Sequence, residues 1–135
     1  MSTLSNTNAF DYINVLGKAA DASWLRNEAI GNNIANVDTP GYKREDVDFQ
    51  SVLKHELRSS KYTSMDAKVA GIKTSHLKVT AHRDYTGYSY RLDGNNVDID
   101  TENAELASNQ LWYNGLINSI KQEFTNLQTA MKSSS

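Results

Sequence analysis

The chain has 135 residues, no cysteine, one proline and a formal net charge of -2. Without cysteine it can form neither a disulfide framework nor a thiolate metal site, and its charge argues against nucleic-acid binding over the whole surface. Hydrophobic residues make up 39% of the chain and mean hydropathy is -0.60, which is low for a compact globule, while the few glycines and the single proline favour long elements.

A long helix is predicted from Ala9 to Asn36, after a flexible N-terminus at residues 1–8. Apolar or small residues recur in alternating steps of four and three, which indicates a heptad seam. Asn8 is expected to cap this helix. Polar Ser23 and Asn27 interrupt the seam and are expected to specify register or partner. The larger apolar members of the seam are Ile13, Leu16, Ile30 and Ile34.

The segment "GNNIANVDTPGYKR" at residues 31–44 ends this helix in an unusual way. Asn36 is expected to end the helix in the left-handed conformation, and Asn32 and Asn33 to bind backbone at a crowded junction. The next four residues predict a turn with proline second and glycine third, where positive φ is needed. These residues are Thr39, Pro40, Gly41 and Tyr42, of which the tyrosine is expected to anchor the departing chain. The alternative is an ordinary surface helix stop, which would need only one cap.

Residues 45–99 are predicted to form a variable and mostly irregular middle segment. Tyr88, Tyr90 and Leu92 alternate before an Asp93-Gly94 turn signal, and Val97 and Ile99 follow it. This pattern predicts a short β-hairpin.

The middle segment is also basic. Between Lys54 and Arg83 there are seven Lys or Arg against two acidic residues, whereas the rest of the chain has seven against fourteen. The segment could be a solvated, mobile insert or a basic contact surface. The first interpretation is favoured because the basic residues are scattered.

A second long helix is predicted over residues 100–132, capped by Asp100 and followed by a tail at 133–135. Its seam includes Leu106, Tyr113, Ile117, Ile120, Phe124 and Leu127. The predicted fold is therefore mainly α, with long N- and C-terminal helices that pair as an antiparallel coiled-coil hairpin.

Four large apolar residues fall outside the two seams. Paired large residues of this kind on long helices indicate burial against other chains, although chance exposure is the simpler alternative. The candidate subunit contacts are Trp24, Leu25, Leu111 and Trp112.

Signatures of enzymes and metal sites fail on inspection. The stretch "HELRS" at His55 has Ser59 where a metalloprotease needs its second histidine. The acidic run from Asp93 has Val97 where an EF-hand needs Asp or Asn. We therefore predict no enzyme, no cofactor, no metal and no small-molecule substrate.

Three stretches carry a family resemblance. "NNIANVDTPGYKR", together with "DVDF" at 46–49 and "LDGNNVDIDTENAELASNQLWYNGLINSI" at 92–120, resembles the bacterial flagellar rod and hook proteins, and the last stretch is similar to the proximal rod members. The resemblance covers about half of the chain and lies in both terminal regions.

The resemblance implies a structural subunit whose terminal helices build a helical tube that transmits torque and forms part of the export channel. It implies export by the flagellar type III apparatus without a cleavable signal peptide, and a place in the basal body across the periplasm. The implied partners are other copies of the chain, other rod proteins, the adaptor FliE, and the MS ring with its export gate. The alternative is a regulatory or nucleic-acid-binding module that uses the basic middle segment.

Overall fold

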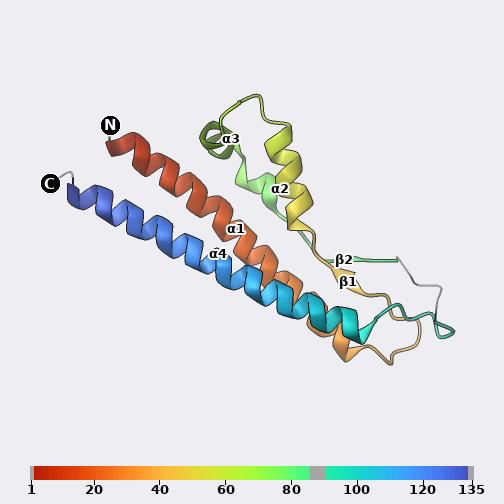
Figure 1. Ribbon diagram of the computed structural model, residues 1–135. Helices are drawn as coiled ribbons and strands as arrows, with labels where there is room; N and C mark the ends of the chain where they lie inside the picture. The colour runs from red at the N-terminus through yellow and green to blue at the C-terminus, as the bar shows by residue number, and fades with distance from the viewer. Residues whose placement is uncertain (1, 86–90, 134–135) are drawn as a thin grey trace.

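The computed structural model describes residues 2–85 and 91–133, and for residues 2–8 and 133 it describes the backbone only. Two long helices, α1 (Ser2–Ala35) and α4 (Ile99–Ser133), lie side by side and run antiparallel, so both ends of the chain lie at one end of the pair (Figure 1). The middle segment packs along α1. The prediction of a mainly α fold with paired terminal helices is confirmed. None of the described helices is both long and apolar enough to span a membrane.

Both long helices begin earlier than the sequence predicts. The α1 helix begins at Ser2, so Asn8 is not its cap. Residues 2–8 contain neither glycine nor proline, and each residue added to an existing helix gains a hydrogen bond. The α4 helix begins at Ile99, and the Asp98 carboxylate caps it by accepting from the backbone N–H of Asp100 at 3.0 Å and of Thr101 at 3.3 Å. The cap predicted at Asp100 is therefore wrong by two residues.

The predicted end segments can be compared with the structure only in part. Flexibility of residues 1–8 stays a prediction, and residues 134–135 of the predicted tail lie outside the described residues.

The middle segment is more helical than predicted. It contains α2 (Phe49–Arg58), α3 (Met65–Gly71) and a short 3-10 helix, η1 (Thr74–Leu77). Caps begin both α-helices, since Asp48 accepts from the N–H of Ser51 at 3.0 Å and Ser64 from that of Ala67 at 3.2 Å. The apolar spacing of Phe49, Val52 and Leu53 is helical, and these residues face the core.

The predicted β-hairpin is wrong where the structure describes it. Tyr88 and Tyr90 lie outside the described residues, and the segment between Arg91 and Asp98 forms no strand. The turn signal itself is confirmed, because Gly94 has a φ of 77° and donates to the Arg91 carbonyl at 3.2 Å. After this turn, the side-chain amides of Asn95 and Asn96 bind backbone of distant segments, as described below. The sheet that does form pairs β1 (Glu45–Asp46) with β2 (His82–Arg83) in antiparallel register.

A small core lies where α1 meets α4 and the middle segment. Alanines form its α1 side, which lets the neighbouring elements approach closely. The buried cluster comprises Ala19, Ala20, Ala22, Val47, Phe49, Leu77 and Leu116. Leu16, Tyr113, Ile117 and Ile120 of the predicted seams pack against this cluster.

The seam of α4 differs from the prediction at alternate positions. Leu116 is buried, whereas Phe124, predicted as a seam residue, is 47% exposed. The structure buries Glu102, Asn109 and Leu116, whereas Ile117 of the predicted seam is only half-buried. The predicted seam follows the largest apolar side chains. In the structure, polar Glu102 and Asn109 are buried as well, which an apolar pattern cannot indicate. The remaining seam residues are buried (Ile30, Leu127) or half-buried (Ile13, Ile34, Leu106).

Candidate functional site

The exit from α1 contains the predicted turn. Gly41 has a φ of 75°, and Tyr42 donates its N–H to the Thr39 carbonyl at 3.2 Å. The expected left-handed conformation of Asn36 is wrong, because its φ is not positive. Instead the Asn36 amide donates to the Asn32 carbonyl at 2.8 Å and accepts from the Thr39 hydroxyl at 3.1 Å. Gly41 supplies the left-handed residue, five positions later.

Asn33 is fully buried and satisfies all of its hydrogen-bonding capacity. Its Nδ2 donates to the Glu45 carbonyl at 2.8 Å and to the Glu102 carboxylate at 3.1 Å. Its Oδ1 accepts from the Glu45 N–H at 2.7 Å and from the Tyr42 hydroxyl at 3.2 Å. One amide therefore joins the end of α1, the strand β1 and the start of α4. Asn32, in contrast, is exposed.

Asn95 closes the C-terminal end of α1 from the far side of the sequence. Its fully buried Nδ2 donates to the carbonyls of Asn36 at 2.8 Å, Val37 at 3.1 Å and Thr39 at 2.8 Å, and its Oδ1 accepts from the Val97 N–H at 2.7 Å. These carbonyls follow Ala35, the last residue of α1, and belong to the segment in which the chain turns away from the helix. Their partner is a residue almost sixty positions away.

Asn96 ties the same segment to the sheet. Its Oδ1 accepts from the Arg44 N–H at 2.7 Å, and its Nδ2 donates to the Asp84 carbonyl at 2.5 Å. The backbone joins in, because Asp84 donates its N–H to the Arg44 carbonyl at 2.8 Å and Gly41 donates to the Asp93 carbonyl at 2.8 Å. The stretch "DGNN" predicts only a turn, and nothing in it indicates that the amides of Asn95 and Asn96 are buried. We call the hydrogen-bonded region made by Asn33, Arg44, Asn95, Asn96 and Glu102 the polar junction.

The Arg44 guanidinium holds the charged part of the polar junction. It donates to Glu102 at 2.6 Å, to Asp84 at 2.6 Å and to Asp46 at 3.3 Å. Glu102 is fully buried, and such a carboxylate is stable only with partners of this kind. Burial opposes the charge on Arg44, but the hydrogen bonds to Glu102 and Asp84 outweigh it, and the pKa of the guanidinium is raised.

A second arginine extends the network along the helix pair. Arg26 of α1 donates to Asp46 at 2.8 Å and to Glu105 of α4 at 2.7 Å. Burial alone would raise the pKa of Asp46, but the hydrogen bonds from Arg26 and from the Val47 N–H outweigh it, so the pKa is lowered. Arg26 therefore ties β1 to both long helices.

Tyr42 occupies the position expected of an anchor. It is half-buried, and its hydroxyl donates to Asn33. Burial, assisted by the nearby charges of Glu45 and Glu102, raises the pKa of its phenol. Tyr42 is therefore held as a neutral donor, while its role in assembly stays a prediction.

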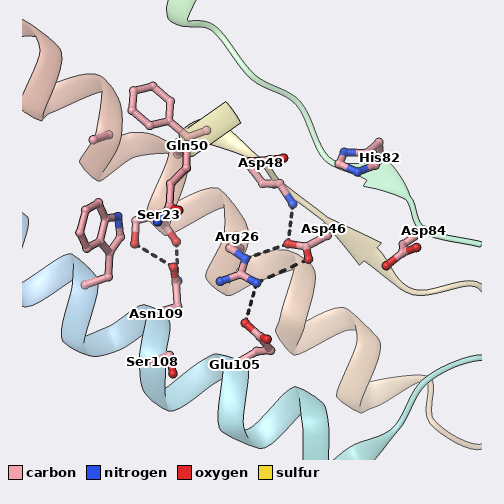
Figure 2. Close-up of a pocket in the computed structure, with 15 residues that line it drawn as sticks. Ser23, Arg26, Asp46, Asp48, Gln50, His82, Asp84, Glu105, Ser108 and Asn109 are labelled. Atoms are coloured by element: carbon pink, nitrogen blue, oxygen red, sulfur yellow. Dashed lines mark hydrogen bonds and ion pairs between the residues drawn. The ribbon is translucent and has the colours of Figure 1, made fainter. Parts of the chain in front are cut away.

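Beside the polar junction lies an open cleft of about 630 Å³ between α1, α4 and the two strands. Figure 2 shows Arg26 and Glu105 on facing helices, with Asp46, Asp48, His82 and Asp84 along the strands. Farther along the helices, Asn109 donates to the Ser23 carbonyl at 2.8 Å and accepts from the Ser23 hydroxyl at 3.1 Å. Trp112 forms part of the cleft wall.

The four candidate subunit contacts lie in different environments. Trp24 is 57% exposed and its ring lies 6.2 Å from that of Tyr113, centroid to centroid. Leu111 is 73% exposed, and Trp112 is 47% exposed beside the cleft. Leu25 is half-buried and packs against the core, so its expected place outside the intramolecular contact is wrong.

The chemistry of the polar junction is that of a clamp. Its carboxylates face arginines, its amides bind backbone, and no group of three or more His, Asp or Glu side chains suited to a metal occurs among the described residues. These contacts fix the angle at which the chain leaves α1 and enters α4. The sequence signal for this was the pair of motif segments at 32–49 and 92–120, which the fold brings together.

Comparison with known proteins gives a consistent result. The family model described as "Flagella basal body rod protein" matches residues 13–43, which span most of α1 and the turn after it. The chain is 34% identical over 139 residues to the flagellar basal body rod protein FlgB of Bacillus subtilis, covering 97% of both chains. It is 31% identical to the FlgB of Escherichia coli, covering 80% of this chain and 83% of that one. It is 34% identical to the FlgB of Borreliella burgdorferi, covering 83% and 89%.

Proposed function

The chain belongs to the FlgB family of flagellar basal body rod proteins and is a structural subunit of that rod, and on this premise we propose that it assembles with further copies of itself through the uncovered face of its helix pair. The family is structural, located in the flagellar basal body, and its members assemble with other rod components. The comparisons give no support to a regulatory or nucleic-acid-binding module.

The observation that carries the proposal is a strip of apolar side chains on the side of the helix pair away from the middle segment. Phe10 and Trp24 are fourteen residues apart on α1, which places them on one face, and they are 51% and 57% exposed. Ala22 lines the cleft, and Trp24, two residues on, is turned from it by about 200°. On α4, Phe124 is 47% exposed. We call Phe10, Trp24 and Phe124 the open face.

These side chains are large, so their burial on association would favour assembly through the open face. Burying one tryptophan that is now exposed could contribute about 2–3 kcal/mol per contact. The family match at residues 13–43 includes Trp24 and the whole of the turn after α1, which agrees with a shared packing role for this helix. The amides of Asn32, Asn33 and Asn36 and the fixed turn would then set the angle of the helix in the assembled tube.

The proposal extends to the ends of the assembly. We infer that the neighbours are other rod proteins on one side, and the adaptor FliE with the MS ring and export gate on the other. We also infer export through the flagellar type III apparatus without a cleavable signal peptide. These inferences rest on family membership.

The test is Trp24→Gln in cells in which the variant replaces the natural chain. Helix content of the purified monomer should change little, because Trp24 is largely exposed, while recovery of basal bodies and swimming should fall at least tenfold. The matched control is Met65→Gln, which alters a residue of α3 that is 54% exposed and lies off the open face. Normal basal bodies in the Trp24 variant, or an equal loss in the control, would rule out the open face.

A further inference from the structure

The cleft beside the polar junction is acidic. Four carboxylates line it, on Asp46, Asp48, Asp84 and Glu105, against the single guanidinium of Arg26 among the lining residues, so with histidine counted as neutral the lining charge is 1 − 4 = −3. Arg26 is already shared between Asp46 and Glu105, and Arg44, which does not line the cleft, pairs with Asp84 and Asp46. With Arg44 counted against the four carboxylates the charge is 2 − 4 = −2. The Asp48 side chain is exposed and accepts the N–H of Ser51, and no ion pair involves it among the described residues. Excess negative charge therefore faces the opening of the cleft.

The cleft also offers an aromatic wall. Trp112 is 47% exposed and lines the cleft from α4. A guanidinium or ammonium group is attracted to the face of an indole ring, and the attraction is strongest where water is partly excluded. The cleft thus combines two features that favour a cationic side chain with a long aliphatic stem.

The middle segment presents matching groups at its outer end. Arg58, Lys61 and Tyr62, which we call the basic tip, lie at the end of α2 and in the connection that follows it. All three are exposed, and neither Arg58 nor Lys61 forms an ion pair within the described residues. Lys61 lies 5.4 Å from the centre of the Tyr62 ring. Residues 54–83 as a whole carry seven basic and two acidic side chains, a net charge of 7 − 2 = +5.

The cleft and the basic tip of one chain cannot meet. Asp48, in the cleft, caps the N-terminal end of α2, and Arg58 is the last residue of this ten-residue helix. The helix therefore separates them by about 15 Å. Figure 1 shows α2 running from β1 beside the helix pair to the connection with α3 at its far end.

We propose that the acidic cleft receives the basic tip of a second copy of the chain. The inference rests on the self-association proposed above and assigns it a second contact. Attraction between the two surfaces is long-ranged and would orient the incoming subunit. Because the two surfaces differ, the contact is heterologous, and repeating it produces a ring or an open helical array, whereas two identical surfaces in contact would produce a closed dimer. The contact would join the middle segment of one subunit to the cleft between the helix pair and the strands of the next.

Charge reversal tests this contact without touching the internal network. Arg58→Glu combined with Lys61→Glu should lower basal-body recovery at least tenfold, while the matched reversal Lys73→Glu with Lys78→Glu, at exposed sites off the tip, should have little effect. Adding Ser108→Lys, at an exposed residue of the cleft, should restore assembly of the tip variant. Normal basal bodies in the tip variant would overturn the inference, and so would an equal loss in the matched reversal or the absence of restoration.

Cross-linking tests the same contact by position. The chain has no cysteine, so an introduced pair is unique. Ser108→Cys with Thr63→Cys should give disulfide-linked multimers in oxidised basal bodies, whereas Thr125→Cys with Thr63→Cys should not, because Thr125 is exposed on α4 outside the cleft. Linkage of the cleft cysteine only to another rod component, or none at all, would overturn the inference. The cross-linking result does not test the open face, which Trp24→Gln tests separately.

Discussion

Asn95→Ala should be among the most damaging single substitutions in this chain. The Asn95 side chain is fully buried, its amide nitrogen serves three carbonyls at 2.8–3.1 Å, and its oxygen takes the N–H of Val97 at 2.7 Å. Two amide hydrogens and one acceptor amount to about three hydrogen bonds, each worth about 1 kcal/mol net, and buried groups left unpaired add to the loss. The free energy of unfolding should fall by about 3–4 kcal/mol, which is a large share of the usual total.

The measurement is urea unfolding followed by far-ultraviolet circular dichroism. Asn32→Ala is the matched control, since Asn32 belongs to the motif segment at the end of α1 but is exposed, and it should change stability by less than about 0.5 kcal/mol. Asn95→Asp keeps the size of the side chain but turns a carboxylate towards three carbonyls, so it should be at least as destabilising as alanine at neutral pH. If Asn95→Ala lowered the free energy of unfolding no more than Asn32→Ala does, the hydrogen bonds of Asn95 to the carbonyls after α1 would not stabilise the fold.

Two further outcomes follow from the same region. Gly41→Ala should lower the free energy of unfolding by about 1–2 kcal/mol, because Gly41 has a φ of 75° although no atom crowds it, whereas Gly31→Ala, inside α1 and equally uncrowded, should raise it by about 0.5–1 kcal/mol. The Asp46 contribution should be present above about pH 4, the pKa in the unfolded chain, and be lost as pH falls through the lower pKa of the folded state. Asp46→Asn should flatten this part of the stability profile in acid unfolding.

The sequence predicted the large elements of this fold because their signals are local and repetitive. Long runs free of proline and a heptad spacing identify α1 and α4, and Pro40 with Gly41 identifies the turn. The failures at the polar junction and in the α4 seam have one physical origin, namely polar groups that are buried because distant segments satisfy them. Nothing near Asn95 or Glu102 in sequence indicates that the partners are the carbonyls just after α1 and Arg44. The same effect misplaced Phe124, since a seam that contains Asn109 is invisible to a search for apolar residues.

Asn109 suggests what such polar seam positions contribute. It is 3% exposed between the long helices and bonds both the backbone and the hydroxyl of Ser23, as well as the amide oxygen of Asn27 at 2.9 Å. The α1 side of the core is largely alanine, so apolar contacts alone discriminate poorly between alternative registers, and a buried amide can specify one at a cost in stability. The double variant Ser23→Ala with Asn109→Leu should therefore keep or raise its helix content while it loses specificity. We expect sedimentation to show concentration-dependent aggregates of mixed size and swimming to fall, whereas Gln110→Leu, at the exposed neighbouring position, should leave both unchanged. A double variant that stays monodisperse and supports normal swimming would show that the alanine contacts fix the register without the amide.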